Sequence, residues 1–192
     1  MEPLLAICAG IALAAASGFR VFVPMLALGI AARSGAINPS AGLEWVGTIP
    51  AIVVFGVATA TEIAAYYIPW VDHALDTVTT PGSVFAGSLA AAAAMGDVDP
   101  AIKWTLAIVA GGGAAAVVQG GTVLTRVLSG ATTGGIGNPV VSTGEAAGSI
   151  VLSILAIVVP LLAAALVIML IAWVIRLFLR WRRQPLLQLD EK

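Results

Sequence analysis

Residues 150–175 read IVLSILAIVVPLLAAALVIMLIAWVI and contain no charged side chain. A helix of this length rises about 39 Å, whereas the hydrocarbon core of a bilayer is about 30 Å thick. We therefore expect one membrane-spanning helix here, tilted or bent near Pro160. Trp173, Arg176 and Arg180 follow at its end, and clustered arginines beside a span favour the cytoplasmic side. The C-terminus is therefore predicted to be cytoplasmic.

The rest of the 192-residue chain has the same character. Hydrophobic residues make up 60% of it and charged residues 10%, a composition outside the range of soluble domains. Further apolar segments cover residues 4–32, 45–68, 84–95 and 101–118. Because one span takes roughly 20 residues, the sequence predicts a single all-α domain over residues 1–192. This domain is a polytopic transmembrane helical bundle of about five spans, and the lipid bilayer is its partner.

Charge and composition exclude several classes of function. The net charge is −1 and the basic residues cluster only in the C-terminal tail, residues 176–192, so nucleic acid is not an expected partner. One cysteine and one histidine leave no basis for a thiolate or histidine metal centre, and no cofactor is expected. Five crossings place the N-terminus outside, with Arg33, Lys103 and the tail inside and Arg126 in an external loop.

The first apolar segment, residues 4–32, is too long for one straight crossing and is interrupted by Gly18, Arg20 and Pro24. Its halves would each reach only about 18 to 21 Å, so two independent crossings are disfavoured. Two interpretations remain, a broken helix and a re-entrant hairpin.

Arg20 is the most informative charge in the sequence, because it follows Gly18 inside apolar sequence. A helix that restarts there directs free N–H groups and a guanidinium toward one point, which is a natural site for a phosphate or carboxylate. The alternative is an internal salt bridge from Arg20 to Glu62 or Asp76 that locks helices together.

Three carboxylates accompany the apolar segments. Glu62 lies near the end of its span and is either a proton or cation ligand or a partly hydrated structural residue. Asp72 and Asp76 are four residues apart and share one face of a helix. This pair either attracts a cation or forms an acidic loop with a helix cap. Spacing identifies no third metal ligand.

Residues 132–139, TTGGIGNP, are too rich in glycine and proline to be helical. Such backbone either lines a cavity or forms an external loop. In the first case its N–H groups help to bind an anion, and Ser142, Thr143 and Glu145 open the final helix.

A faint internal repeat is present, in which similar residues occur in the same order in two parts of the chain. Units 1–68 and 101–175, joined by a span at 82–96, would then form an inverted repeat of the kind found in transporters. Chance is the alternative, because Asn-Pro is a common turn dipeptide. The residues that recur are Arg20, Asn38-Pro39, Glu44 and Pro50, and then Arg126, Asn138-Pro139, Glu145 and Pro160.

Small residues recur at helical spacing, as in Gly10 with Ala14 and Gly144 with Gly148. Such pairs let helix backbones approach closely. Plain helix packing explains them fully, and they are also consistent with an assembly factor. A homo-oligomer is left open as a partner.

Several motifs resemble those of a bacterial integral-membrane family catalogued as a domain of unknown function. They are Ser17-Gly18-Phe19-Arg20-Val21-Phe22-Val23-Pro24, Glu62-Ile63-Ala64, Ile68-Pro69-Trp70-Val71-Asp72 and Gly135-Ile136-Gly137-Asn138-Pro139-Val140-Val141-Ser142. The resemblance covers nearly the whole chain and implies a multi-pass protein of the bacterial cytoplasmic membrane. Similar sequences tend to carry a Glu-Asp pair where this chain has Glu145-Ala146. The family supplies no activity.

We therefore expect a small transporter or channel for an anionic or phosphate-bearing small molecule or lipid headgroup. The substrate-binding residues would be Arg20, Arg126, Asn138, Ser142 and Glu145, with Glu62, Asp72 and Asp76 as coupling or pairing carboxylates. One alternative is an intramembrane lipid-modifying enzyme with a cation at Asp72 and Asp76, which is less favoured because the sequence offers no obvious nucleophile. Another alternative is a non-catalytic membrane assembly factor. Neither catalytic residues nor metal ligands can be assigned.

Overall fold

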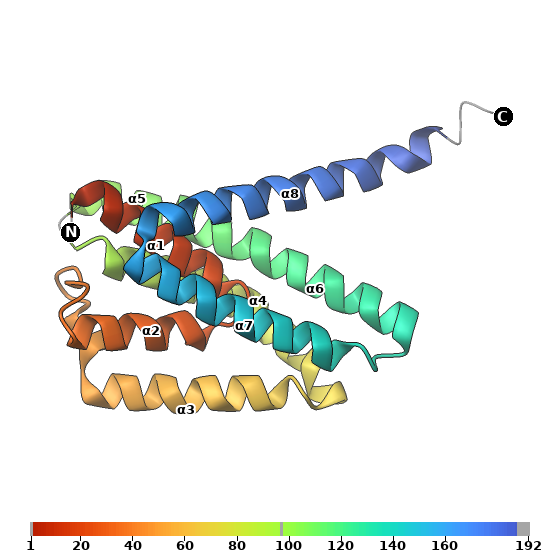
Figure 1. Cartoon of the computed structure of the whole chain (residues 1–192), viewed down its shortest axis with the longest axis horizontal. Coiled ribbons are helices and arrows are strands. Elements are labelled where there is room, and N and C mark those ends of the chain that lie inside the picture. Colours follow the sequence, from red (N-terminus) through yellow and green to blue (C-terminus); the bar gives the residue numbers. More distant parts are fainter. Residues whose placement is uncertain (1, 97, 188–192) are drawn as a thin grey trace.

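A computed structural model describes residues 2–96 and 98–187, except for the side chains of residues 69, 70, 72–74, 177, 178 and 180–187. Within these ranges all regular structure is helical, so the all-α class is confirmed. Figure 1 shows the helices packed as one bundle from which α8 projects. The helices are α1 (Pro3–Ser17), α2 (Phe22–Arg33), η1 (Glu44–Gly47), α3 (Ile49–Ala65), α4 (Pro69–Ala94), α5 (Pro100–Leu106), η2 (Ala107–Gly112), α6 (Gly113–Thr133), α7 (Asn138–Val158) and α8 (Pro160–Leu187).

The first apolar segment forms a hairpin of two short helices. α1 ends at Gly18, and α2 runs back toward the end of the bundle where the chain begins (Figure 1). The loop after α2 is tied to the last turn of α4, because Ser40 donates hydrogen bonds to the carbonyl oxygens of Ala92 and Ala93 at 2.9 and 3.0 Å. The segment is therefore a helical hairpin, and its re-entry into a membrane stays a prediction.

α1 forms the centre of the bundle and packs against α4, α6, α7 and α8. Small side chains make this possible, because a Cβ added at Gly10 would lie 2.9 Å from the carbonyl oxygen of Ala91 in α4. A Cβ at Gly18 would lie 2.5 Å from the carbonyl oxygen of Ala115 in α6. The tip of the hairpin is thus fixed by backbone-to-backbone contact.

The long central helices extend well beyond the apolar segments that predicted them. The segment 84–95 is only the second half of α4, and 101–118 is the first half of a continuous helix, Pro100–Thr133, that contains the π-helical turn η2. The first half of α4 and the second half of Pro100–Thr133 carry polar side chains. These side chains lower the mean hydropathy of the helices, and yet they are buried. They include Thr79, Ser83, Gln119, Thr122 and Arg126. The prediction that Arg126 lies in an external loop was therefore wrong.

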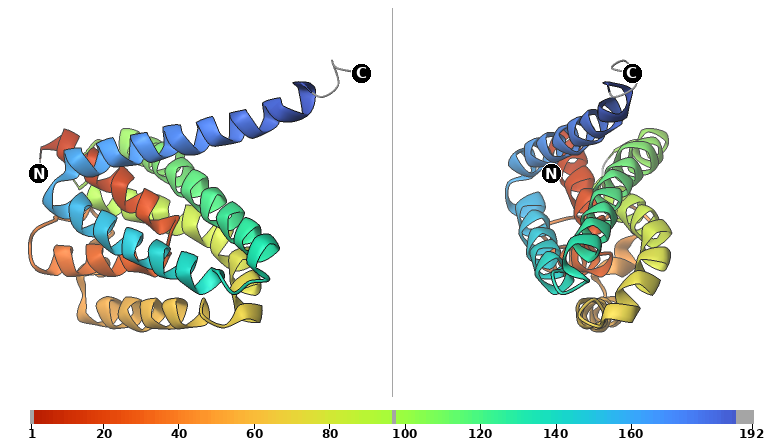
Figure 2. Two further views of the ribbon diagram at one scale, coloured as in Figure 1. Left: turned by 45° about the vertical axis from the view of Figure 1, so that its right-hand side comes forward. Right: turned by 90° about the vertical axis from the view of Figure 1, so that its right-hand side faces the viewer.

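Residues 150–175 do not form the predicted single span. α7 ends at Val158, Val159 leaves the helical region with φ −136° and ψ 70°, and α8 begins at Pro160. Proline donates no backbone hydrogen bond and disfavours helical conformation in the residue before it. The chain consequently reverses direction here instead of bending (Figures 1 and 2).

This reversal changes which basic residues share an end of the bundle. Arg33 and Lys103 lie where α2 ends and α5 begins, whereas α8 runs to the opposite end (Figure 1). The prediction that both residues lie on the same side as the C-terminal arginines was wrong. Residues 176–187 continue α8, and residues 188–192 of the predicted tail lie outside the described residues.

The glycine-rich segment between α6 and α7 is shorter than predicted. α6 continues to Thr133, and α7 begins at Asn138. Gly134 and Gly135 make the turn with φ of +63° and +90°, a conformation that favours glycine. Ser142 and Glu145 therefore lie inside a helix that begins well before residue 150.

The two halves of the proposed repeat place corresponding residues in unlike surroundings. Glu44 is exposed in η1, whereas Glu145 is buried in α7. Asn38-Pro39 belongs to a loop, whereas Asn138-Pro139 begins a helix.

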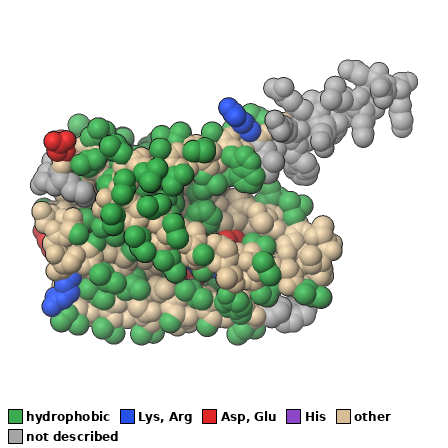
Figure 3. Space-filling model, viewed as in Figure 1, with side chains coloured by type: hydrophobic (Ala, Val, Ile, Leu, Met, Phe, Trp, Pro, Cys, Tyr) green, Lys and Arg blue, Asp and Glu red, His purple; other side chains and the backbone are tan. Residues whose placement is uncertain are grey.

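The outer surface of the bundle is rich in exposed hydrophobic side chains (Figure 3). Two helices, Pro100–Thr133 and Asn138–Val158, are long and apolar enough to cross a membrane by length and composition. Shorter apolar helices are α1, α2, α3 and residues 160–176. These features are weak support for a membrane protein, because buried helices of soluble proteins can meet the same criteria.

Candidate functional site

The tip of the hairpin carries Arg20 into a buried group of polar residues. Tyr66 caps the end of α3, Asp76 comes from α4, Arg126 from α6 and Glu145 from α7. We call Arg20, Tyr66, Asp76, Arg126 and Glu145 the arginine cluster. Arg20 is only 1% exposed and Glu145 only 6%, so these charges are held away from solvent.

Glu145 joins the two arginines. Its Oε2 atom lies 3.3 Å from Nη1 of Arg20 and also accepts a hydrogen bond from Nη2 of Arg126. Nε of Arg126 donates to both carboxylate oxygens at 3.1 Å. Charged hydrogen bonds of this kind are among the strongest in proteins, so Glu145 is the centre of the network.

The second carboxylate, Asp76, accepts a hydrogen bond from Nη1 of Arg126 at 2.5 Å. The hydroxyl of Tyr66 lies 3.4 Å from Asp76 and 3.0 Å from Oγ1 of Thr79. Nε2 of Gln119 in turn donates to Thr79 at 3.4 Å. The cluster thus extends through hydroxyl and amide groups along α4 and α6.

The Tyr66 ring contacts both guanidinium groups. The Cζ atoms of Arg20 and Arg126 lie 3.9 and 4.1 Å from the ring centroid. Cations over an aromatic face are attracted by the ring quadrupole, more strongly when they are removed from water. This role of Tyr66 was not predicted from the sequence. The signal that could have indicated it is the position of Tyr66 one helical turn after Glu62.

The N–H groups at the start of α2 are bound by a carboxylate of the same chain. Oε1 and Oε2 of Glu62 accept hydrogen bonds from the backbone nitrogens of Val21 and Phe22 at 2.8 and 3.0 Å. Glu62 therefore caps a helix whose own N-cap side chain makes no capping bond. The predicted single anion site, built from these N–H groups and the Arg20 guanidinium together, is not what the structure shows.

Arg20 is held by α7 and not by the carboxylates suggested for its salt bridge. Its Nη2 atom donates to the carbonyl oxygen of Ser142 at 2.9 Å and to the Ser142 hydroxyl. Its ion pair is with Glu145, so Glu62 or Asp76 as its partner was wrong. Nε of Arg20 is buried and has no hydrogen-bond partner among the described residues.

Three of the predicted binding residues form one stripe on α7. Asn138, Ser142 and Glu145 follow one another at spacings of four and three residues, which places them on one face of a helix. All three are buried. Ser149 continues the stripe and donates to the carbonyl oxygen of Ala16 in the hairpin at 3.0 Å. This helical spacing was the signal that α7 begins at Asn138.

The side chain of Asp72 lies outside the described residues, so its predicted pairing with Asp76 is untested. Among the side chains that are described, no three histidine, cysteine, aspartate or glutamate residues gather as a metal site would require. Asp76 is instead bound by Arg126.

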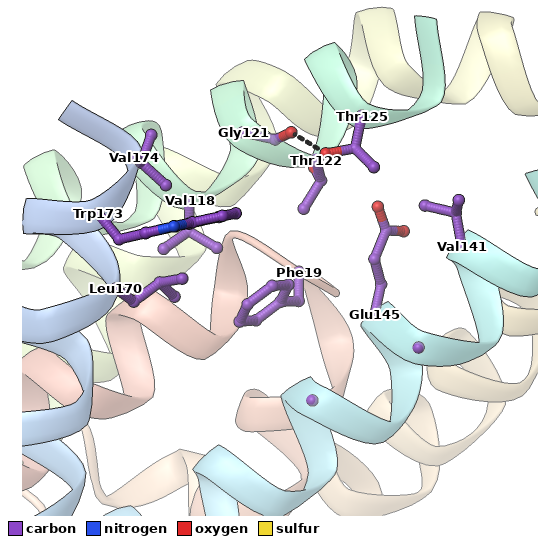
Figure 4. A pocket seen from close by; sticks show the side chains of 12 residues that line it. Phe19, Val118, Gly121, Thr122, Thr125, Val141, Glu145, Leu170, Trp173 and Val174 are labelled. Carbon is purple, nitrogen blue, oxygen red and sulfur yellow. Dashed lines mark hydrogen bonds between the residues drawn. The ribbon is translucent and has the colours of Figure 1, made fainter. Parts of the chain in front are cut away.

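A cavity of about 310 Å³ lies between α6, α7 and α8, beside the arginine cluster. Figure 4 shows Phe19 from the hairpin, Trp173 from α8 and the carboxylate of Glu145 facing it. We call it the lateral groove. The residues that line it are Phe19, Val118, Gly121, Thr122, Thr125, Val141, Gly144, Glu145, Gly148, Leu170, Trp173 and Val174.

The comparisons with known proteins identify a family and no activity. No curated protein and no solved structure matches the chain. A family model described as a domain of unknown function (DUF4126) matches residues 7–180. Because this match covers most of the chain, the protein belongs to that family.

Proposed function

We propose that the protein is a multi-pass membrane transporter or channel for an anionic or phosphate-bearing solute, which binds at the arginine cluster. The observation that carries this proposal is the delivery of Arg20 by a hairpin tip to a buried point shared with Arg126 and Glu145. Ionisable residues inside a membrane are costly, and they usually belong to substrate or ion pathways.

The fold supports a membrane arrangement with five crossings. α3, α4, the continuous helix Pro100–Thr133, α7 and α8 would cross, and the hairpin of α1 and α2 would enter and leave on one side. α1 and α2 rise only about 22 and 18 Å, less than the roughly 30 Å of the hydrocarbon core. The arginines that follow Trp173 favour a cytoplasmic C-terminus. The N-terminus would then lie outside.

In this orientation the arginine cluster lies nearer the cytoplasmic face. Arg126 precedes the end of α6 by seven residues, and Glu145 follows the start of α7 by seven. Each lies about 10 Å inside its helix end. A solute from the cytoplasm would reach the cluster past the turns that join α3 to α4 and α6 to α7.

The chemistry of the cluster suits exchange between carboxylates and a solute anion. Arg20 and Arg126 offer two guanidinium groups, and Glu145 with Asp76 supplies two compensating charges. A phosphate or carboxylate of the solute can replace one of these carboxylates at an arginine, which keeps the buried cation paired, and the displaced carboxylate must then be hydrated or protonated. The unpartnered Nε of Arg20 adds one donor for it.

The enzyme hypothesis has less support. Its cation would bind Asp76, whose Oδ1 atom accepts a hydrogen bond from the Arg126 guanidinium. An arginine so close to a carboxylate repels a divalent cation.

Native mass spectrometry of gently extracted protein tests the proposal. We expect an anionic species bound to the wild type and to Arg33→Ala, and absent from Arg20→Ala. Arg33 is the matched control, because it is an exposed arginine at the other end of the hairpin.

Size-exclusion chromatography must show that Arg20→Ala is folded. If Arg20→Ala is not folded, Arg20→Lys takes its place. Lysine keeps the positive charge but cannot make the forked contact of the guanidinium with Ser142. We expect this variant to lose the bound anionic species as well. An identical set of bound species in wild type and the folded variant would overturn the proposal.

A further inference from the structure

The lateral groove contains open space along one face of α7. Gly144 and Gly148 lie one helical turn apart on its wall, and a Cβ added at either would meet no atom within 4 Å. The sequence predicted that this glycine pair packs against another helix. Among the described residues no atom covers it, so the space that the glycines leave is open to a ligand.

One end of the groove offers acceptors of hydrogen bonds. Glu145 lines this end. Its Oε2 atom is occupied by Arg20 and Arg126, whereas Oε1, among the described residues, accepts only from Nε of Arg126 and keeps one acceptor position. The hydroxyls of Thr122 and Thr125 donate their protons to the carbonyl oxygens of Gln119 and Gly121, each at 2.8 Å. Each hydroxyl therefore keeps only lone pairs for a ligand, so the polar end selects a donor and repels an anion.

The remainder of the groove is apolar. Val118, Leu170, Trp173 and Val174 line it. α6 and α8 diverge toward the end of α8 (Figure 1), and the groove lies in the angle between them. Exposed apolar side chains such as Leu124 on α6 lie outside it. In the membrane arrangement proposed above, on which this inference rests, a ligand can thus enter sideways from the hydrocarbon phase.

The size and lining of the groove suit a lipid chain. Its volume is about 310 Å³. Ligand cavities begin at about 300 Å³. A flexible chain of methylene groups fits this space, and a polar headgroup fits its acceptor end.

We infer that the lateral groove binds a membrane lipid whose headgroup carries N–H donors, as phosphatidylethanolamine does. The acyl chain lies along Gly144, Gly148 and Leu170, and the ammonium group donates to Glu145 and Thr125. A phosphatidylcholine headgroup has the same charges but no N–H group, so it loses these bonds. This site adjoins the solute site proposed at Arg20 and Arg126, and Glu145 belongs to both.

The test compares two lipids and three variants in native mass spectra. The protein is reconstituted in nanodiscs of equal parts phosphatidylethanolamine and phosphatidylcholine, extracted gently and measured. We expect about tenfold more bound phosphatidylethanolamine, as one or two hydrogen bonds to a charged acceptor would give.

Gly148→Leu fills the groove and should abolish the bound lipid. Gly120→Leu is its matched control, because Gly120 is an exposed glycine of α6 that also has open space and does not line the groove. Thr125→Val removes one acceptor from an exposed position and should reduce the preference for phosphatidylethanolamine while lipid still binds.

Three results would overturn the inference. Retention of the bound lipid by Gly148→Leu would show that the lipid binds outside the lateral groove. Equal binding of phosphatidylethanolamine and phosphatidylcholine would show that the N–H donors of the headgroup do not contribute to binding. A dimer that dissociates in Gly148→Leu would show that a second copy of the chain occupies the groove. Loss of lipid only in the groove variant, with the Arg20-dependent species unchanged, would separate this site from the proposed solute site.

Discussion

The two faces of α7 show opposite uses of one helix. The face toward the hairpin carries Ser142, Glu145 and Ser149, which are buried and bonded to Arg20 and Ala16. The face toward the lateral groove carries Gly144 and Gly148, beside which there is open space. Polar residues thus fix the helix to its neighbour, whereas glycines of similar spacing leave open space beside the helix.

Glu145→Ala should have the largest effect, because Glu145 supports both arginines. Its removal leaves two buried guanidinium groups without their shared carboxylate, a change that costs about 3 to 5 kcal/mol in comparable buried pairs. Denaturant titration in detergent, followed by tryptophan fluorescence, measures the free energy of unfolding. Glu44→Ala is the control, because Glu44 is exposed in η1. Equal stability of the two variants would mean that the cluster does not hold α7 to the hairpin.

Gly18→Ala should have the next largest effect, because Gly18 lies where the hairpin tip meets α6. Its new Cβ would lie 2.5 Å from the carbonyl oxygen of Ala115 and 2.7 Å from Cβ of Val118. Neither atom belongs to the end of a flexible side chain, so the backbone itself must shift. Overpacking of this kind costs about 1 to 3 kcal/mol. Heating followed by size-exclusion chromatography should show a lower melting temperature than that of the wild type.

An unchanged melting temperature for Gly18→Ala would show that the hairpin tip can move away from α6 at little cost. The contact would then be loose, and the difference between the packed and open glycines would disappear.

Much of the fold and part of the site could be predicted from the sequence. Composition predicted the all-α class, and Gly18 with Arg20 indicated a break that is in fact a hairpin tip. Arg20, Arg126, Ser142 and Glu145 were all predicted as site residues, and the structure brings them together. Their role in substrate binding stays a prediction. Charges and hydroxyls in apolar sequence are informative because burial is too costly without partners.

The helix ends and the choice of partners could not be predicted in the same way. Hydropathy averages over a window, so buried polar residues such as Gln119 and Ser149 made long helices resemble short ones. Pro160 allowed either a bend or a reversal, and local sequence does not decide between them. The pairing of Arg20 with Glu145 joins residues far apart in the chain, and only the packing of the helices selects it.

Gly144→Ala should have the smallest effect and the opposite sign. A Cβ at this position meets no atom within 4 Å, and alanine is more favourable than glycine within a helix by about 0.5 to 1 kcal/mol. The variant should therefore unfold at a slightly higher temperature than the wild type, in the same assay in which Gly18→Ala unfolds at a lower one. The two variants make the same chemical change, so their opposite signs compare the overpacking at Gly18 with the helix preference for alanine at an open position. A destabilised Gly144→Ala variant would mean that another group already occupies the groove and touches this face of α7.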